Sequence, residues 1–222
     1  MNLPQSGSGL TRAERSRMQA FAFDHIGERY DEVFPHKEGQ LNAISWLAGR
    51  LKPGARVLDA GCGTGVPAAQ QLTRAGARVT GIDISPVMLD LARRNVPEAT
   101  FIQLDIMDIT PALGEFDAAV AFFSLLMLPR AAIPGALARL REVLVPGGWF
   151  TLGMVEADID DVPIRFLGVP VRVTGYIRDD LRDVVATAGF SVIGEDSHSY
   201  APTSAEVPPE IQLTLCCQRA DD

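Results

Sequence analysis

The sequence predicts an α/β fold, a mostly parallel sheet with helices on both faces. Strand-like apolar runs alternate with helical stretches between residues 55 and 190, and parallel strands require such crossover helices. The last two strand-like runs, 191–197 and 210–219, have no helix between them, so we expect an antiparallel pair. The 222 residues suit a single domain, expected over 11–222.

The N-terminal part is expected to be helical. Residues 1–10 are rich in Gly, Ser and Pro, which predicts disorder. From Thr11 the pattern becomes helical, and a second helix is expected over about 39–51, before Lys52-Pro53-Gly54. One apolar stripe at helical spacing joins Phe23, Ile26, Tyr30 and Phe34.

The alternation of the sheet begins at residue 55. Strands are expected at 55–60, 77–83, 99–105, 116–123 and 149–156. Helices are expected at 66–76, 86–95, 131–144 and 179–190. Ser85 and Pro86 suit a helix start, and Gly76 and Gly189 suit helix ends. Residues 157–177, rich in Asp, Pro and Gly, are expected to be an insertion outside the sheet.

Composition narrows the class of protein. Hydrophobic residues make up 47% and charged residues 22%, and no apolar run reaches the roughly 20 residues of a membrane span. The N-terminus lacks a signal-peptide pattern. The net charge of −8, without a Lys/Arg cluster, argues against a nucleic-acid partner. Three cysteines, two of them adjacent, suit a reducing cytoplasm and no structural zinc site. We expect a cytoplasmic monomer or homodimer that acts on a small molecule without a metal.

The stretch VLDAGCGTG (57–65) leads from the first strand into the first crossover helix. Ligands bind at this edge of open α/β sheets. Gly61, Gly63 and Gly65 allow a ligand to approach the backbone closely. The glycines alone are also compatible with a tight turn that binds nothing, so they are weak evidence.

Carboxylates at successive strand ends indicate an adenosine ligand. Asp83 ends the second strand at the spacing that suits ribose hydroxyls, and Asp105 with Ile106 suits the amine and face of an adenine. A dinucleotide is disfavoured, because Val66 departs from GxGxxG and Asp59 would lie beside a pyrophosphate. S-adenosylmethionine (SAM) removes both objections, since it carries an ammonium and a sulfonium and no phosphate.

Together these stretches resemble the small-molecule branch of the class I SAM-dependent methyltransferases. Similar to the family motifs are VLDAGCGTG, GIDISPVMLDLAR (81–93), QLDIMD (103–108) and LVPGGWF (144–150), in this order. The resemblance covers about 55–150 and, more loosely, the whole chain. It implies a Rossmann-like seven-stranded sheet of order 3-2-1-4-5-7-6, in agreement with the antiparallel final pair.

The resemblance also implies a cofactor site that takes SAM and releases S-adenosylhomocysteine (SAH). Gly61 and Gly63, with Cys62 between them, would hold the methionine part, and Asp59 would organise the turn. Tyr30 would either bind the methionine carboxylate from a helical lid (11–51) or pack in the core. The other implied contacts are Asp83 with the ribose, Ile84 and Met88 with the adenosine, Asp105 and Ile106 with the adenine, and Ala121 and Phe122 with the methionine end.

Methyl transfer from a sulfonium depends on positioning, and a base is needed only where the acceptor must lose a proton. The candidates for a base are His25, His36 and His198, although each also fits an ordinary surface histidine. Many relatives read SLLHLP after the fourth strand. This chain reads SLLMLP (124–129), which favours an acceptor that is already nucleophilic, or apolar contacts.

The insertion at 157–177 lies where the family usually forms its substrate lid. The expected acceptor contacts are Phe123, Met127, Asp158, Arg165, Phe166 and Tyr176, and a solvated loop fits the insertion equally well. The leading interpretation is methyl transfer, by in-line displacement, to nitrogen or oxygen of a specialised metabolite. A SAM-binding scaffold, or another reaction on this fold, stays open. An NAD(P)-dependent oxidoreductase is disfavoured by the glycine pattern, and a macromolecular methyltransferase by the acidic charge.

Overall fold

The computed structural model describes residues 9–35, 37–201 and 209–220, so most of the segment predicted to be disordered lies outside it. The helices are α1 (Arg12–Ile26), α2 (Arg29–Val33), α3 (Glu38–Ala48), α4 (Ala68–Arg74), α5 (Pro86–Asn95), α6 (Ile133–Val143) and α7 (Arg178–Thr187). The strands are β1 (Arg56–Ala60), β2 (Arg78–Asp83), β3 (Thr100–Gln103), β4 (Phe116–Phe122), β5 (Leu144–Val155), β6 (Ile159–Phe166), β7 (Val169–Gly175), β8 (Phe190–Tyr200) and β9 (Glu210–Arg219).

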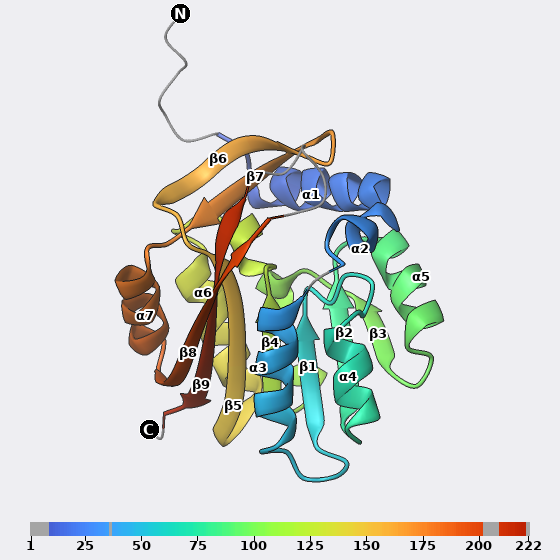
Figure 1. The fold of residues 1–222 in the computed structure, drawn as a ribbon, viewed down its shortest axis with the longest axis vertical. Coiled ribbons are helices and arrows are strands. Elements are labelled where there is room, and N and C mark those ends of the chain that lie inside the picture. The colour runs from blue at the N-terminus through green and yellow to red at the C-terminus, as the bar shows by residue number, and fades with distance from the viewer. Residues whose placement is uncertain (1–8, 36, 202–208, 221–222) are drawn as a thin grey trace, which may run out of the picture.

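Seven strands form one sheet of order β3-β2-β1-β4-β5-β9-β8. The first five strands pair in parallel, whereas β9 runs antiparallel to both β5 and β8. The predicted sheet order is therefore confirmed, with β8 and β9 as its sixth and seventh strands. The carboxyl ends of the parallel strands meet at one edge, which Figure 1 shows at the top.

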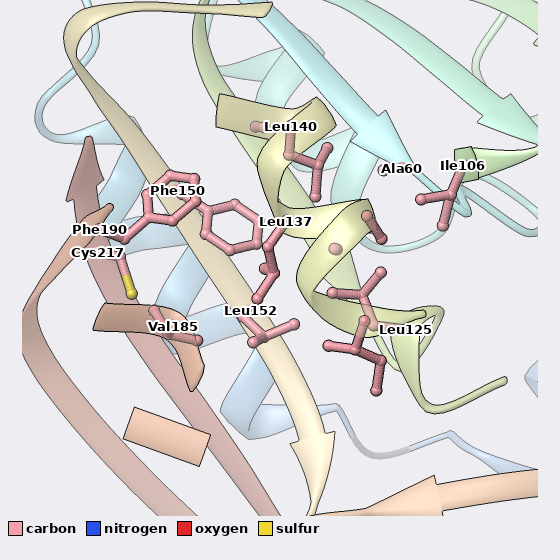
Figure 2. Packing of buried hydrophobic residues seen from close by; sticks show 14 of the residues in the cluster. Ala60, Ile106, Leu125, Leu137, Leu140, Phe150, Leu152, Val185, Phe190 and Cys217 are labelled. Carbon is pink, nitrogen blue, oxygen red and sulfur yellow. The ribbon is translucent and has the colours of Figure 1, made fainter. Parts of the chain in front are cut away.

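Helices cover both faces of the sheet, as predicted. Residues of α3, α4 and α5 pack on one face, and residues of α6 and α7 pack on the other. Figure 2 shows Leu137 and Leu140 of α6, Val185 of α7 and Phe150 in one apolar cluster, in which the ring centroids of Phe150 and Phe190 are 4.9 Å apart. The central strands β1 and β4 are buried on both faces, which is why their sequences read as nearly continuous apolar runs.

Helix α1 and a β6–β7 hairpin lie across the carboxyl end of the sheet (Figure 1). The hairpin falls in the predicted insertion at 157–177, where no strands were expected. Its turn, Leu167-Gly168, has φ values of +51° and +81°, as a two-residue type I′ turn requires. Leu167 is 1% exposed and packs in a cluster with Ile26 and Met88, so burial of its side chain offsets the backbone strain.

The predicted helical stripe is divided at Gly27, where α1 ends with φ +50°. Its residues nevertheless share one cluster, because Phe23, Ile26, Tyr30 and Phe34 all pack there. No helix within the described ranges is long and apolar enough to cross a membrane.

An ion-pair network joins α1 to the hairpin. The Nη1 and Nη2 atoms of Arg15 both donate to the Asp161 carboxylate, with an Nη2–Oδ2 distance of 2.9 Å. Arg172 places its Nε 2.8 Å from Asp161 Oδ1, and the Asp161 amide donates to Thr174 Oγ1 at 3.0 Å. The three charged side chains are 10–19% exposed. Arg15 is the α1 member of this network, so its pair with Asp161 ties the helix to the hairpin. We call these residues the Asp161 network.

Candidate cofactor and acceptor site

A cavity of about 770 Å³ lies at the carboxyl end of the sheet. Its walls come from the ends of β1 to β4, from the N-terminal helices, from the hairpin and from the adjoining ends of β8 and β9. A cavity of this size, lined mostly by apolar side chains with a few polar groups, is typical of a small-molecule site.

The glycine turn forms one wall, and two of its glycines have different constraints. A Cβ on Gly61 would lie 2.2 Å from Cβ of Ser124, whose hydroxyl donates to the Ala60 carbonyl at 2.6 Å. Gly61 is therefore required for close packing between β1 and the end of β4. A Cβ on Gly63 would meet nothing within 4 Å, and its φ is +51°. Gly63 thus presents bare backbone to open space.

Asp83 is fixed by backbone amides at the end of β2. Its Oδ2 accepts from the Gly63 amide and its Oδ1 from the Ser85 amide, both at 2.9 Å. Burial raises the pKa of Asp83, and these hydrogen bonds oppose that shift. Each carboxylate oxygen keeps a lone pair beyond these contacts, so the group can still accept from a pair of hydroxyls.

Asp59 is 2% exposed, and its Oδ2 has no hydrogen-bond partner among the described residues. Burial, and secondarily the charge of Asp83, raises the pKa of Asp59 to about 7. A buried oxygen without a partner is costly. The orphaned oxygen therefore fits a ligand that brings a donor or a positive charge, and it would be unfavourable beside a phosphate.

The residues expected to contact an adenine follow the third strand. Asp105 Oδ1 accepts from the Met107 amide at 2.8 Å, which fixes the carboxylate beside apolar Ile106. Ile84 and Met88 line the same region, so an acid and an apolar wall lie next to each other.

Most of the predicted cofactor residues line the cavity. They are Tyr30, Asp59, Gly61, Cys62, Gly63, Asp83, Ile84, Met88, Asp105, Ile106 and Phe122. Ala121 does not line it, because its side chain packs in the core on the α6 side of β4. Burial raises the pKa of the Cys62 thiol well above its ordinary value, which disfavours a nucleophilic thiolate.

The expected acceptor residues are divided. Phe123, Met127 and Phe166 line the cavity, whereas Asp158, Arg165 and Tyr176 do not. Three local contacts account for the second group. Exposed Asp158 pairs with Arg130 at 2.7 Å, exposed Arg165 donates to the Gly168 carbonyl at 3.0 Å, and Tyr176 is buried with its ring 4.7 Å from the Arg130 guanidinium.

Two of the candidate histidines lie outside the cavity walls. His25 is exposed, with Nδ1 2.8 Å from the Phe21 carbonyl oxygen. His198 places its Nε2 2.9 Å from Asp196 Oδ2. His36 is outside the described residues. Within the described ranges, no group of three or more His, Cys, Asp or Glu side chains is arranged to hold a metal ion.

Sequence reasoning missed several polar residues of the cavity wall, most of them from elements distant in the sequence. They include Gln19, Lys37, Gln40, Thr64, Ser124, Glu156, Thr174, Ser199, Tyr200, Glu210 and Gln212. Gln40 lies on the buried face of α3 and Gln212 lies between the apolar residues of β9, and both are buried. A buried amide in such a stretch is a usable signal, because it requires a partner or a ligand.

Comparisons with known proteins agree with this geometry. Residues 57–148 match the family described as "Methyltransferase domain". The chain is 34% identical over 163 residues to an uncharacterised methyltransferase of Synechocystis sp., which covers 71% of this chain and 76% of that protein. It is 30% identical over 210 residues to a demethylmenaquinone methyltransferase of Corynebacterium kroppenstedtii. That match covers 92% of this chain and 85% of that protein.

A solved structure shares the fold. The 1,6-didemethyltoxoflavin-N1-methyltransferase of Burkholderia thailandensis, with bound 1,6-didemethyltoxoflavin and SAH, matches with a TM-score of 0.74 at 23% identity. The match covers 98% of this chain and 94% of that one. The glycine turn, the strand-end acids and these relatives lead to one conclusion: the chain belongs to the class I SAM-dependent methyltransferases.

Proposed function

We propose that this methyltransferase acts on a nitrogen or oxygen atom of a small, largely apolar acceptor, in specialised metabolism. The observation that carries the proposal is the cavity of about 770 Å³, in which the strand-end acids and an extensive apolar wall face the same space. Part of its apolar wall comes from the N-terminal helices and the hairpin, which we propose act as lids over the cofactor and the acceptor.

The residues fit SAM in specific places. We assign the ribose hydroxyls to Asp83 and the adenine to the Asp105–Ile106 pair. The orphaned Asp59 Oδ2 suits the ammonium, directly or through water. When bound, SAM supplies the methyl group on a sulfonium, which is an excellent leaving group. The protein then has to orient the acceptor and exclude water.

The choice of nitrogen or oxygen is supported by the loop after β4. Met127 lines the cavity where many relatives carry a histidine, and the two described histidines lie elsewhere. An acceptor that is nucleophilic without a histidine base fits this arrangement. The net charge of −8 supports a small molecule over a nucleic acid. The three free, buried cysteines support a cytoplasmic protein.

The first test is calorimetric titration of the protein with SAM, SAH and NADH in parallel. We expect micromolar binding of the two sulfur compounds and none of NADH. Binding of NADH alone would contradict the assignment of Asp59 and the glycine turn. A following screen of small acceptors, read out as SAH formed, separates a working methyltransferase from a SAM-binding scaffold. The scaffold interpretation gains support if SAM binds and no acceptor is turned over.

A further inference from the structure

Glu210 differs from the other acids of the cavity wall. Asp59, Asp83 and Asp105 belong to the proposed cofactor site, and Glu156 is 3.2 Å from the Arg178 guanidinium. Glu210 accepts a hydrogen bond from Gln212 Nε2 at 2.7 Å, and no cation pairs with it among the described residues. A half-buried carboxylate without a cation has capacity left for a donor from a ligand.

The strand register places Glu210 in a polar group away from the glycine turn. Glu210 and Gln212 lie two residues apart on β9, so they share the face that α3 covers. Tyr200 pairs directly with Glu210 across β8 and β9, which puts its side chain on the same face. Gln40 of α3 also lines the cavity, is 9% exposed, and its Oε1 lacks a partner among the described residues.

Aromatic rings surround this polar group. The ring of Phe34 is 5.6 Å from Tyr200 with an interplanar angle of 18°, and 5.8 Å from Phe166 with an angle of 26°. Tyr30 lies 5.2 Å from Phe34, and all four rings line the cavity. Burial raises the pKa of Tyr30, and the charges of Asp31, Glu210 and Asp83 add to the shift. Tyr30 therefore joins the aromatic rings near Glu210 and lines the same cavity as Asp83.

We propose that Glu210, oriented by Gln212, is a specificity-determining residue that selects a planar aromatic acceptor bearing an N–H or O–H donor. The donor bonds to the Glu210 carboxylate, and the ring rests on the wall formed by Phe34, Phe166 and Tyr200. Burial raises the pKa of Glu210 and the Gln212 hydrogen bond lowers it, so the carboxylate is costly to keep unpaired. The inference rests on the proposed function, because it names the acceptor class for that site.

The test uses two probes, indole and 1-methylindole, which carries a methyl group in place of the N–H donor, with the protein saturated with SAH. Ligand-detected NMR titration measures the two dissociation constants. We expect indole to bind about tenfold more tightly, the factor that a hydrogen bond to a charged group supplies. The Glu210→Gln variant keeps the shape and an acceptor for Gln212, and we expect it to reduce the ratio to about twofold or less. Glu142→Gln, exposed on α6, is the matched control and keeps the wild-type ratio.

A second variant tests the ring wall separately. Phe166→Leu is expected to weaken both probes by the same factor, several-fold, and to leave their ratio unchanged. The proposal is overturned by equal binding of both probes to the wild type, by a ratio that survives Glu210→Gln, or by no binding of either probe. SAH titration of the wild type and of each variant distinguishes failure of the acceptor inference from failure of the proposed function. SAH binding with no selectivity defeats only the inference, whereas loss of SAH binding by the wild type defeats the proposed function itself.

Discussion

Replacing Asp59 by asparagine should stabilise the ligand-free protein at neutral and alkaline pH. Asp59 is 2% exposed, and burial raises its pKa from 3.8 to about 7. Between these two values the folded state keeps a proton that the unfolded state has lost. The free energy of unfolding therefore falls as pH rises through this window, and the loss is complete above the folded-state pKa.

The magnitude follows from the shift of the pKa. Each unit corresponds to about 1.4 kcal/mol, so the ionised Asp59 carboxylate costs about 4 kcal/mol above about pH 7. At about pH 5.5 only about 2 kcal/mol of that cost has accumulated. Asparagine carries no charge at either pH. The stability difference between Asp59→Asn and the wild type should therefore grow by about 2 kcal/mol between about pH 5.5 and about pH 8.

Urea denaturation of the ligand-free proteins at both pH values measures this difference. Asp90→Asn on α5, with a side chain 74% exposed, is the control and should show no such growth. A difference that stays constant with pH would refute the argument that Asp59 is held as a costly buried acid. The same substitution should weaken SAH binding about tenfold, because it removes a charge-assisted contact to the ammonium.

Other substitutions separate binding from folding. Asp83→Ala should weaken SAM and SAH binding at least about tenfold by calorimetry, since it removes two acceptors for the ribose; unchanged affinity would remove Asp83 from the site. Gly61→Ala should unfold the chain or lower its melting temperature strongly because its Cβ collides with Ser124, whereas Gly63→Ala should retain the fold and lose SAH binding. The opposite pattern would contradict the assigned turn. Arg15→Ala should accelerate limited proteolysis within residues 159–175 by tenfold or more, because it removes the part-buried ion pair that joins α1 to Asp161 of the hairpin. Arg165→Ala, an exposed arginine of the same hairpin, is the control, and equal cleavage of the two variants would show that the network does not hold the hairpin.

The sequence predicted the sheet well because its central strands are buried on both faces. Such apolar runs are each followed by a helix with recognisable ends. They therefore leave little doubt about which segments are strands and in which order strands and helices alternate. The ends of β1, β2 and β3 were also predictable, because the turn and the acids immediately follow apolar runs. For that reason the sequence pattern alone places Asp59, Asp83 and Asp105 at one edge of the sheet.

The hairpin was not predictable from its turn. Type I′ turns are usually marked by Asn or Gly at the first central position, and this chain has Leu167 there. Its left-handed backbone is compensated by burial against residues of α1 and α5, which a local pattern does not contain. The acceptor side was missed for the same reason. Gln40, Glu210 and Gln212 come together only because α3 packs against the last strand, β9.

The position of β9 between β5 and β8 affects how the chain folds during its synthesis. The last strand in the sequence occupies an inner place in the sheet, so a nascent chain that stops short of residue 210 leaves β5 and β8 with unpaired edges. Such edges favour association between chains. Truncations that remove residues 210–219 should therefore yield insoluble protein, whereas an added tag after residue 220 lies beyond the last pairing. On the ribosome, the sheet closes only after these residues emerge from the exit tunnel, so the earlier strands stay incompletely paired until then.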